Sequence, residues 1–95
     1  MAVKNRSRTE LIDAILHSMG SGSLKTHIMC AAVVSHTQVN EYLKFMMERD
    51  LVGYEQETGL YFLKDNGLLY MRAYDKVRQL LNPMETKSKL ELFAR

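Results

Sequence analysis

Residues 25–49 read KTHIMCAAVVSHTQVNEYLKFMMER, and this stretch decides the fold. It begins with a short segment that is apolar on one side and ends with a longer amphipathic run that starts at His36. Three apolar side chains of that run stand at i, i+4 and i+7 and share one helical face that must be buried: Val39, Leu43 and Met46. Just before the run, Ser35 is a good N-cap because its hydroxyl can accept a hydrogen bond from a free amide of the next turn. The stretch therefore predicts two helices joined by a tight turn.

The other face of the second helix carries side chains that donate or accept hydrogen bonds: His36, Thr37, Gln38, Asn40, Glu41 and Lys44. Two helices joined by a tight turn, with the second polar and outward, form the helix-turn-helix arrangement that docks in a DNA major groove. In its first turns, Gln38 can pair with adenine and Thr37 can touch a thymine methyl group. Lys25 and Thr26 begin the first helix and can hold a phosphate together with its free amides. An ordinary solvated helix face is the alternative for each of these residues.

Residues 1–8 are predicted to form a flexible basic arm. Lys4, Arg6 and Arg8 can reach a phosphate or a minor groove from it, and a solubilising terminus is an equal alternative. The predicted DNA-binding residues are therefore Arg6, Arg8, Lys25, Thr26, Ser35, His36, Thr37, Gln38, Asn40, Glu41 and Lys44.

After the arm, Ser7 or Thr9 caps a first helix, and Glu10 can complete a capping box with Ser7. The buried stripe of this helix is Leu11, Ile12, Ile15, Leu16 and Met19. Gly20 and Gly22 end the helix, and the connector 21–23 can carry a brief extended segment.

The pattern changes from helical to extended after residue 50. Residues 51–55 alternate as a strand, 57–59 form a turn in which Gly59 can take a positive φ angle, and 60–63 return as a second strand. Tyr61 and Leu63 are expected to point inward. Two strands joined by a tight hairpin after a helix-turn-helix make a wing.

A long last helix is predicted over residues 65–82, where Pro83 ends it. Its first turn, with Leu68 and Leu69, should pack against the domain. Apolar residues then repeat at the spacing of a coiled-coil seam, which favours self-association over packing within one domain. The predicted dimer interface is Tyr70, Ala73, Val77, Leu80, Leu81 and Met84. Residues 83–95 form a tail that either adds a short helix or stays disordered.

Composition sets the broad class of protein. The chain has 95 residues, of which 46% are hydrophobic and 25% charged, and this suits one small globular domain. A net charge of +2 permits a nucleic-acid partner without demanding one. The single Cys30 excludes an intramolecular disulfide, and no apolar run reaches the roughly 18 residues of a membrane span. We therefore expect a soluble protein of the cytoplasm, associated with the nucleoid and without membrane contact.

Several motifs together resemble one family. The run 24–29 is similar to the start of the second helix in small archaeal winged helix-turn-helix DNA-binding proteins. In that family a turn at a serine follows, here Ser35, and then a Tyr-Leu pair in the recognition helix, here 42–43. A hairpin closing on Tyr-x-Leu comes next, here 61–63, and a glycine soon afterwards, here Gly67.

The resemblance covers about residues 8–81. It implies a homodimer joined through the last helix as an antiparallel coiled coil, which binds double-stranded DNA as a chromatin or regulatory protein. This chain departs from the family at the hairpin tip, where 55–57 read Glu-Gln-Glu, because carboxylates repel the DNA backbone. It departs also at Pro83, which shortens any coiled coil, and at the start of the last helix, where Lys64-Asp65 stand in place of a threonine cap.

Other kinds of site lack the residues that they need. His27, Cys30 and His36 lie close in sequence, but no carboxylate or second cysteine is spaced to complete a tetrahedral metal site. No nucleophile with its base, phosphate-binding glycine loop or carboxylate pair is present. We therefore expect no enzyme activity, no cofactor or metal, and no small-molecule ligand.

The sequence thus predicts a mainly helical protein with a small β-hairpin. A winged helix-turn-helix domain spans 9–64, and the long helix 65–82 follows it as the dimerisation element. The predicted function is that of a dimeric DNA-binding protein, with helix 35–49 in the major groove. The alternative is a winged-helix protein-interaction module that does not bind DNA, favoured by the acidic wing, the low net charge and Glu41.

Overall fold

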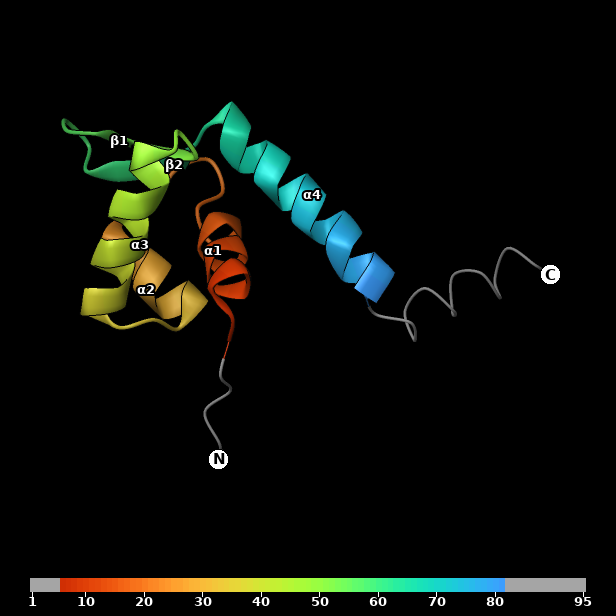
Figure 1. Cartoon of the computed structure of the whole chain (residues 1–95). Helices are drawn as coiled ribbons and strands as arrows, with labels where there is room; N and C mark the ends of the chain where they lie inside the picture. Colours follow the sequence, from red (N-terminus) through yellow and green to blue (C-terminus); the bar gives the residue numbers. More distant parts are fainter. Residues whose placement is uncertain (1–5, 82–95) are drawn as a thin grey trace.

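Three helices, a β-hairpin and a long last helix follow one another along the chain (Figure 1). The structure is a computed structural model, and it describes residues 6–81. Its elements are α1 (Arg8–His17), α2 (Lys25–Ala32), α3 (His36–Glu48), β1 (Val52–Glu55), β2 (Leu60–Leu63) and α4 (Asp65–Leu81). This confirms the predicted mainly helical fold with one two-stranded hairpin and a long last helix. Pro83, Met84 and the tail 83–95 lie outside the described residues.

One hydrophobic core holds α1, α2, α3 and the start of β1 together. Its buried side chains are Leu11, Ile12, Ile15, Leu16, Met19, Ile28, Ala32, Val34, Val39, Leu43, Met46 and Val52. The buried stripes predicted for α1 and α3 are therefore confirmed. Each fully buried aliphatic side chain contributes roughly 1.5–3 kcal/mol to folding, so these stripes fix how the helices pack.

Reciprocal capping boxes begin two of the helices. The Ser35 hydroxyl accepts a hydrogen bond from the Gln38 amide at 3.1 Å, and the Gln38 side-chain oxygen accepts one from the Ser35 amide at 3.1 Å. Ser7 and Glu10 make the same pair at the start of α1. Both boxes satisfy amides that have no partner within the helix, which fixes where α1 and α3 start.

Replacing Ser35 by Ala removes the hydroxyl of the α3 box and leaves the Gln38 amide without that acceptor. We expect the Ser35→Ala variant to be less stable by about 1 kcal/mol. Urea unfolding followed by circular dichroism measures the loss. The exposed Thr37→Ala, at the second residue of the same helix, is the matched control. Equal stability of the two variants would contradict the prediction.

The hairpin is antiparallel and pairs Val52 with Leu63 and Tyr54 with Tyr61. Gly59 takes a φ of 74° in the turn, as predicted. Tyr61 and Leu63 are half-buried, whereas Phe62 between them is exposed. The connector adds a short third segment, because Ser23 and Tyr61 exchange backbone hydrogen bonds of 2.9 and 2.8 Å. The hairpin is therefore tied to the connector between α1 and α2.

The first turn of α4 packs differently from the prediction. Leu68 and Leu69 are 41% and 58% exposed, so the expectation that they pack against the domain is wrong. Gly67 is instead the buried residue of the described helix, and it lies against the backbone of Leu51. A glycine allows this close approach of two backbones. The side of α4 that contacts the rest of the domain therefore contains Gly67, and Leu68 and Leu69 point away from it.

Candidate nucleic-acid interface

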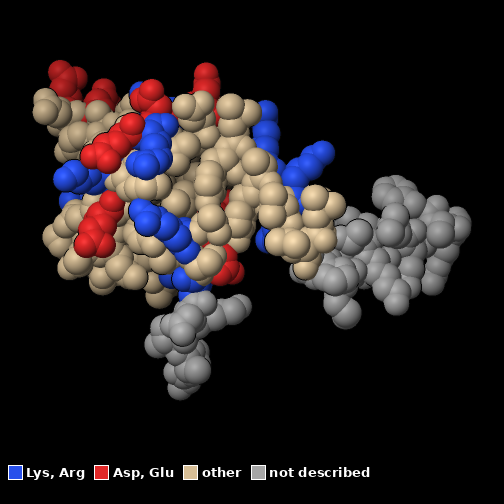
Figure 2. All heavy atoms as spheres, in the orientation of Figure 1, with Lys and Arg blue, Asp and Glu red and all other residues tan. Residues whose placement is uncertain are grey.

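The outward side of α3 is exposed along its length. Thr37, Glu41, Lys44 and Glu48 stand at i, i+4, i+7 and i+11, opposite the buried face of the helix, and all four are exposed. This line of side chains alternates in charge. In Figure 2 carboxylates gather over the hairpin at the upper edge of the molecule, with lysines and arginines below them. A partner that docks on α3 therefore meets both signs of charge.

Gln38 is less free than its sequence position indicates. Its side-chain oxygen is held by the Ser35 amide in the capping box. A bidentate pair with adenine uses that same oxygen, so the capping box competes with this contact. The spacing Ser35-x-x-Gln38 was the available sequence signal, because it is the signature of a capping box.

Lys25 is joined to α3 by a chain of hydrogen bonds. Its ammonium group donates to the Asn40 side-chain oxygen at 2.6 Å, and the Asn40 amide nitrogen lies 3.2 Å from Nδ1 of His36. The chain brings the start of α2 to the first turns of α3. Leu24 supplies no side-chain cap to α2, so Lys25 and the exposed Thr26 lie beside backbone amides without a side-chain acceptor. This corner combines a cation with free amides, which is the chemistry that binds phosphate.

Residues 6–8 are held on the domain rather than extending as a loose arm. Arg8 is the first residue of α1. The Arg6 guanidinium donates to the carbonyl oxygens of Ala32 and Val33 at 2.7 and 2.9 Å. Val33 ends α2 with a φ of 57°, which is unfavourable for a β-branched residue. Arg6 therefore stabilises the turn between α2 and α3. Its guanidinium already donates to these two carbonyl oxygens, so it is less available to a DNA phosphate. Residues 1–5 of the predicted arm lie outside the described residues.

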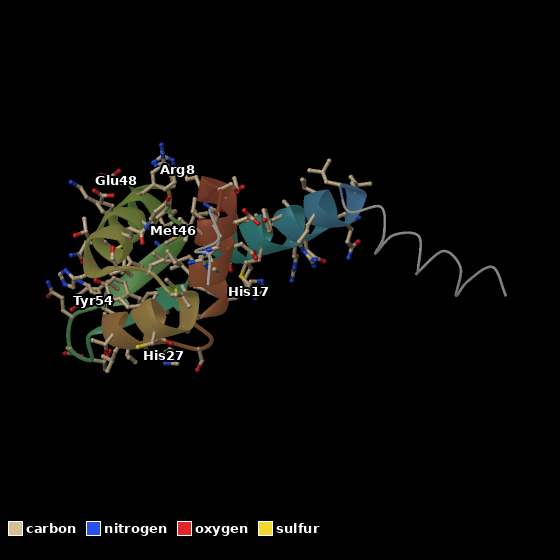
Figure 3. All side chains as sticks on the ribbon, turned by 90° about the horizontal axis from the view of Figure 1, so that it is seen from below. Arg8, His17, His27, Met46, Glu48 and Tyr54 are labelled. Atoms are coloured by element: carbon tan, nitrogen blue, oxygen red, sulfur yellow. The ribbon has the colours of Figure 1, made fainter. Side chains whose placement is uncertain are left out.

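Sequence reasoning missed Arg49. Its guanidinium carbon lies 3.8 Å from the centre of the Phe45 ring, and that of Arg8 lies 4.4 Å from the same centre. Figure 3 places Arg8 and Glu48 along one edge of the molecule, beside α3. The i, i+4 spacing of Phe45 and Arg49 on a helix was the sequence signal for their contact. The approach of Arg8 had no such signal, because it comes from another helix.

The wing is acidic at its tip, as its sequence predicts. Glu55, Gln56 and Glu57 are exposed, and Thr58 donates a hydrogen bond of 2.9 Å to the Glu55 carboxylate. Tyr54 is exposed as well, with its ring centre 4.6 Å from that of Tyr61. Carboxylates at this tip disfavour contact with a phosphate backbone.

Groups of metal ligands and membrane-spanning helices can be checked in residues 6–81. No three His, Cys, Asp or Glu side chains of this part come together as metal ligands, and Cys30 is exposed. None of the described helices has the length and apolar character needed to cross a bilayer.

The arrangement of three helices, a polar exposed α3 and a hairpin wing defines a class of protein. Residues 5–82 match the winged helix-turn-helix family, and the chain belongs to that family. Its fold is similar to the crystal structure of Sso10a-2, a DNA-binding protein from Sulfolobus solfataricus. The TM-score is 0.71 at 19% sequence identity, with 95% of this chain and 98% of that chain covered. A comparison with curated proteins found no match. The predicted likeness to small archaeal winged helix-turn-helix proteins is thus confirmed for the fold.

Proposed function

We propose that this protein binds double-stranded DNA and inserts α3 in the major groove, as a transcriptional regulator or a chromatin-associated protein of the nucleoid. The exposed outward side of α3 carries this proposal, because its opposite side is buried and its start is fixed by the Ser35 capping box. Among the described residues, no carboxylate lies within ion-pair distance of Lys25 or Lys44, so both charges are available to phosphates. The name of the structural relative Sso10a-2, a DNA-binding protein, supports the same conclusion.

Some side chains of α3 are placed to contact the DNA bases, and others to contact the sugar-phosphate backbone. Thr37 and Glu41 are in the first turns of the outward line, where side chains reach base edges. A glutamate there can accept a hydrogen bond from the amino group of cytosine. Lys25, Thr26 and the free amides of α2 hold a phosphate, while Lys44 contacts the backbone. His36 and Asn40 position Lys25 through their hydrogen-bond chain.

We infer further that two chains associate through α4. Val77, Leu80 and Leu81 are 48%, 79% and 77% exposed, and Ala73 is exposed beside them. A groove of about 260 Å³ runs next to this row and is lined by Thr9, Tyr70, Ala73, Tyr74 and Val77. An exposed apolar row with a neighbouring groove is typical of a surface that binds another protein. A second α4 fits it, because the same row would supply the side chains that fill the groove.

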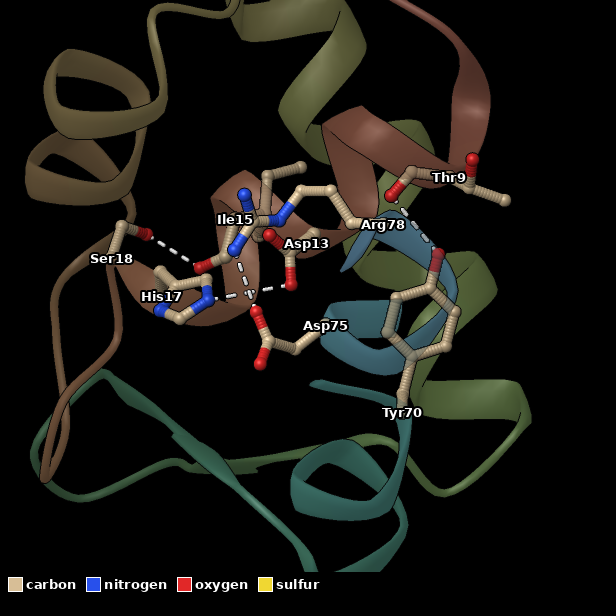
Figure 4. A network of polar contacts seen from close by, with 8 residues as sticks. All are labelled: Thr9, Asp13, Ile15, His17, Ser18, Tyr70, Asp75 and Arg78. Carbon is tan, nitrogen blue, oxygen red and sulfur yellow. Dashed lines mark hydrogen bonds and ion pairs between the residues drawn. The ribbon is translucent and has the colours of Figure 1, made fainter. Parts of the chain in front are cut away.

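A network of polar contacts lies at the junction between α1 and α4, next to the apolar row (Figure 4). The Tyr70 hydroxyl donates to the Thr9 carbonyl at 3.0 Å, so Tyr70 belongs partly to this junction. Asp13 lies 3.4 Å from His17, and Arg78 lies 2.6 Å from Asp75. Burial raises the pKa of the Asp13 carboxyl group, although His17 and Arg78 oppose the shift. The hydrogen bond of Tyr70 joins α4 to α1, and Val77 borders the groove beside this junction.

Fluorescence anisotropy of a labelled duplex of about 20–30 base pairs, titrated at several salt concentrations, tests the proposal. We expect binding that weakens log-linearly with salt, because phosphate contacts release counterions. Lys25→Ala and Lys44→Ala should each flatten the slope by about one contact. The exposed Lys76→Ala on α4 is the matched control and should leave the slope unchanged.

A second candidate function is a protein-interaction module, which Glu41 and Glu48 on the outward side of α3 favour. Together with Glu55 and Glu57 at the wing tip, they give this face a partly acidic character. Absence of binding to any mixed-sequence duplex at low salt would contradict the chromatin role and favour this module.

A further inference from the structure

Phe45 brings together two arginines that are far apart in the sequence. Arg8 comes from the first turn of α1 and Arg49 from the residue after α3. Their guanidinium carbons lie 4.4 and 3.8 Å from the centre of the one ring, and Arg8 also lies 5.9 Å from the Tyr42 ring centre. At these distances both cations interact with the face of an aromatic ring.

This pair of charges is not neutralised by the described part of the chain. Neither guanidinium has a carboxylate within ion-pair distance there, although Glu41 lines a shallow pocket with Arg8 and Tyr42 and Glu48 adjoins Arg49. Two cations held near one ring repel each other. Arg8 also stands in the first turn of α1, where the helix dipole disfavours a cation. The Phe45 ring stabilises each guanidinium, whereas their mutual repulsion and the helix dipole act against the pair, and a bound anion would relieve both.

The chemistry of the pair fits a phosphodiester group. A guanidinium that lies against a ring is held in place and keeps its N–H edges free, and those edges match the oxygens of a phosphate. Arg8 and Arg49 are both exposed, so these edges face solvent.

The position of the pair fits the wall of a groove. Phe45 and Arg49 are on the flank of α3, next to the outward line of Thr37, Glu41 and Lys44. An α-helix is about 10–12 Å across with its side chains, and the major groove is about 12 Å wide. When α3 fills the groove, its flanks therefore lie against the sugar-phosphate backbones.

We infer that Arg8 and Arg49, positioned by Phe45, form a binding site for a backbone phosphate of the duplex that α3 enters. The site is separate from the corner at Lys25 and Thr26, because it is on the flank of α3 that faces α1. The inference rests on the proposed binding of duplex DNA. It adds a second row of backbone contacts, one on each side of the recognition helix.

The test compares the salt dependence of duplex binding for Arg8→Gln, Arg49→Gln and the native full chain. Each substitution should flatten the log-log slope by about 0.9 for each domain bound to the duplex, because one phosphate contact per domain is lost. The matched control is Arg72→Gln, which removes the same charge from an exposed position on α4 and should leave the slope at the native value. A purely structural role of the arginines would change thermal stability without changing the slope.

A further variant, Phe45→Leu, distinguishes the charge of the two arginines from their positioning by the ring. It keeps both arginines, so the slope should stay near the native value while the affinity falls several-fold. Thermal unfolding of each variant shows whether the domain remains folded. If the native chain binds DNA and both arginine variants keep the slope of Arg72→Gln, the phosphate site is wrong and the proposed function stands. If the native chain binds no duplex, both are wrong.

Discussion

Gly67→Ala is expected to unfold at a clearly lower temperature than the native chain. In an unobstructed helix, the same change stabilises by about 1 kcal/mol. Here the added methyl group would overlap the Leu51 carbonyl oxygen and lie 3.3 Å from a methyl group of Leu63. That carbonyl already accepts a hydrogen bond of 3.0 Å from the Lys64 amide, so it cannot move away without cost. Overpacking of this kind destabilises by about 1–3 kcal/mol or more.

Thermal unfolding followed by circular dichroism measures the effect, at one fixed protein concentration because association also raises Tm. Each kcal/mol lost lowers Tm by about 4–8 °C in a domain of this size. Asn66→Ala is the matched control, since its side chain is exposed at the neighbouring position of α4. It should unfold at or slightly above the native temperature. A Gly67→Ala variant that is more stable than the native chain would show that α4 does not approach the hairpin so closely.

The double variant Val77→Asp with Leu80→Asp is expected to be monomeric under conditions in which the native chain is dimeric. Both side chains are largely exposed in the single chain, at 48% and 79%, so the domain should remain folded. In the proposed dimer they are buried against a second α4, where unpaired carboxylates are strongly unfavourable. Sedimentation equilibrium over a range of protein concentrations measures the mass directly.

The same variant should also bind duplex DNA more weakly. Two domains that are joined in one dimer raise the effective concentration of the second domain, and their combined affinity can exceed that of one domain by about 10²-fold or more. Lys76→Gln is the matched control, because it changes an exposed α4 residue outside the apolar row. A native chain that sediments with the mass of one chain at all concentrations would contradict the dimer.

Local patterns in the sequence were enough to predict the elements of this fold. The apolar spacing of Val39, Leu43 and Met46 predicts a helix with a buried face, and all three are buried. Ser35 caps the next turn because its partner is three residues away. Gly59 takes the positive φ angle that the hairpin turn requires. Each of these features depends on neighbours within one or two turns, and for that reason they can be read without a tertiary structure.

The candidate interface was predicted less completely. The outward residues of α3 are exposed where the helical period places them. The hydrogen bond from Lys25 to Asn40 and those from Arg6 to Ala32 and Val33 join residues 15, 26 and 27 positions apart. No periodicity connects such residues, so the contact of Lys25 with Asn40 and the hydrogen bonds that hold the Arg6 guanidinium became visible only in the folded chain.

The sequence by itself determined the order of the helices and strands, their caps and their buried faces, because periodicity and short-range hydrogen bonds act within a few residues. Only the tertiary structure decided how these pieces meet. Gly67, not Leu68 or Leu69, faces the hairpin because two backbones approach closely there. Arg8 and Arg49 share the Phe45 ring because α1 packs against the helical core. Such contacts depend on the packing of whole elements, and the properties of one short stretch do not specify them.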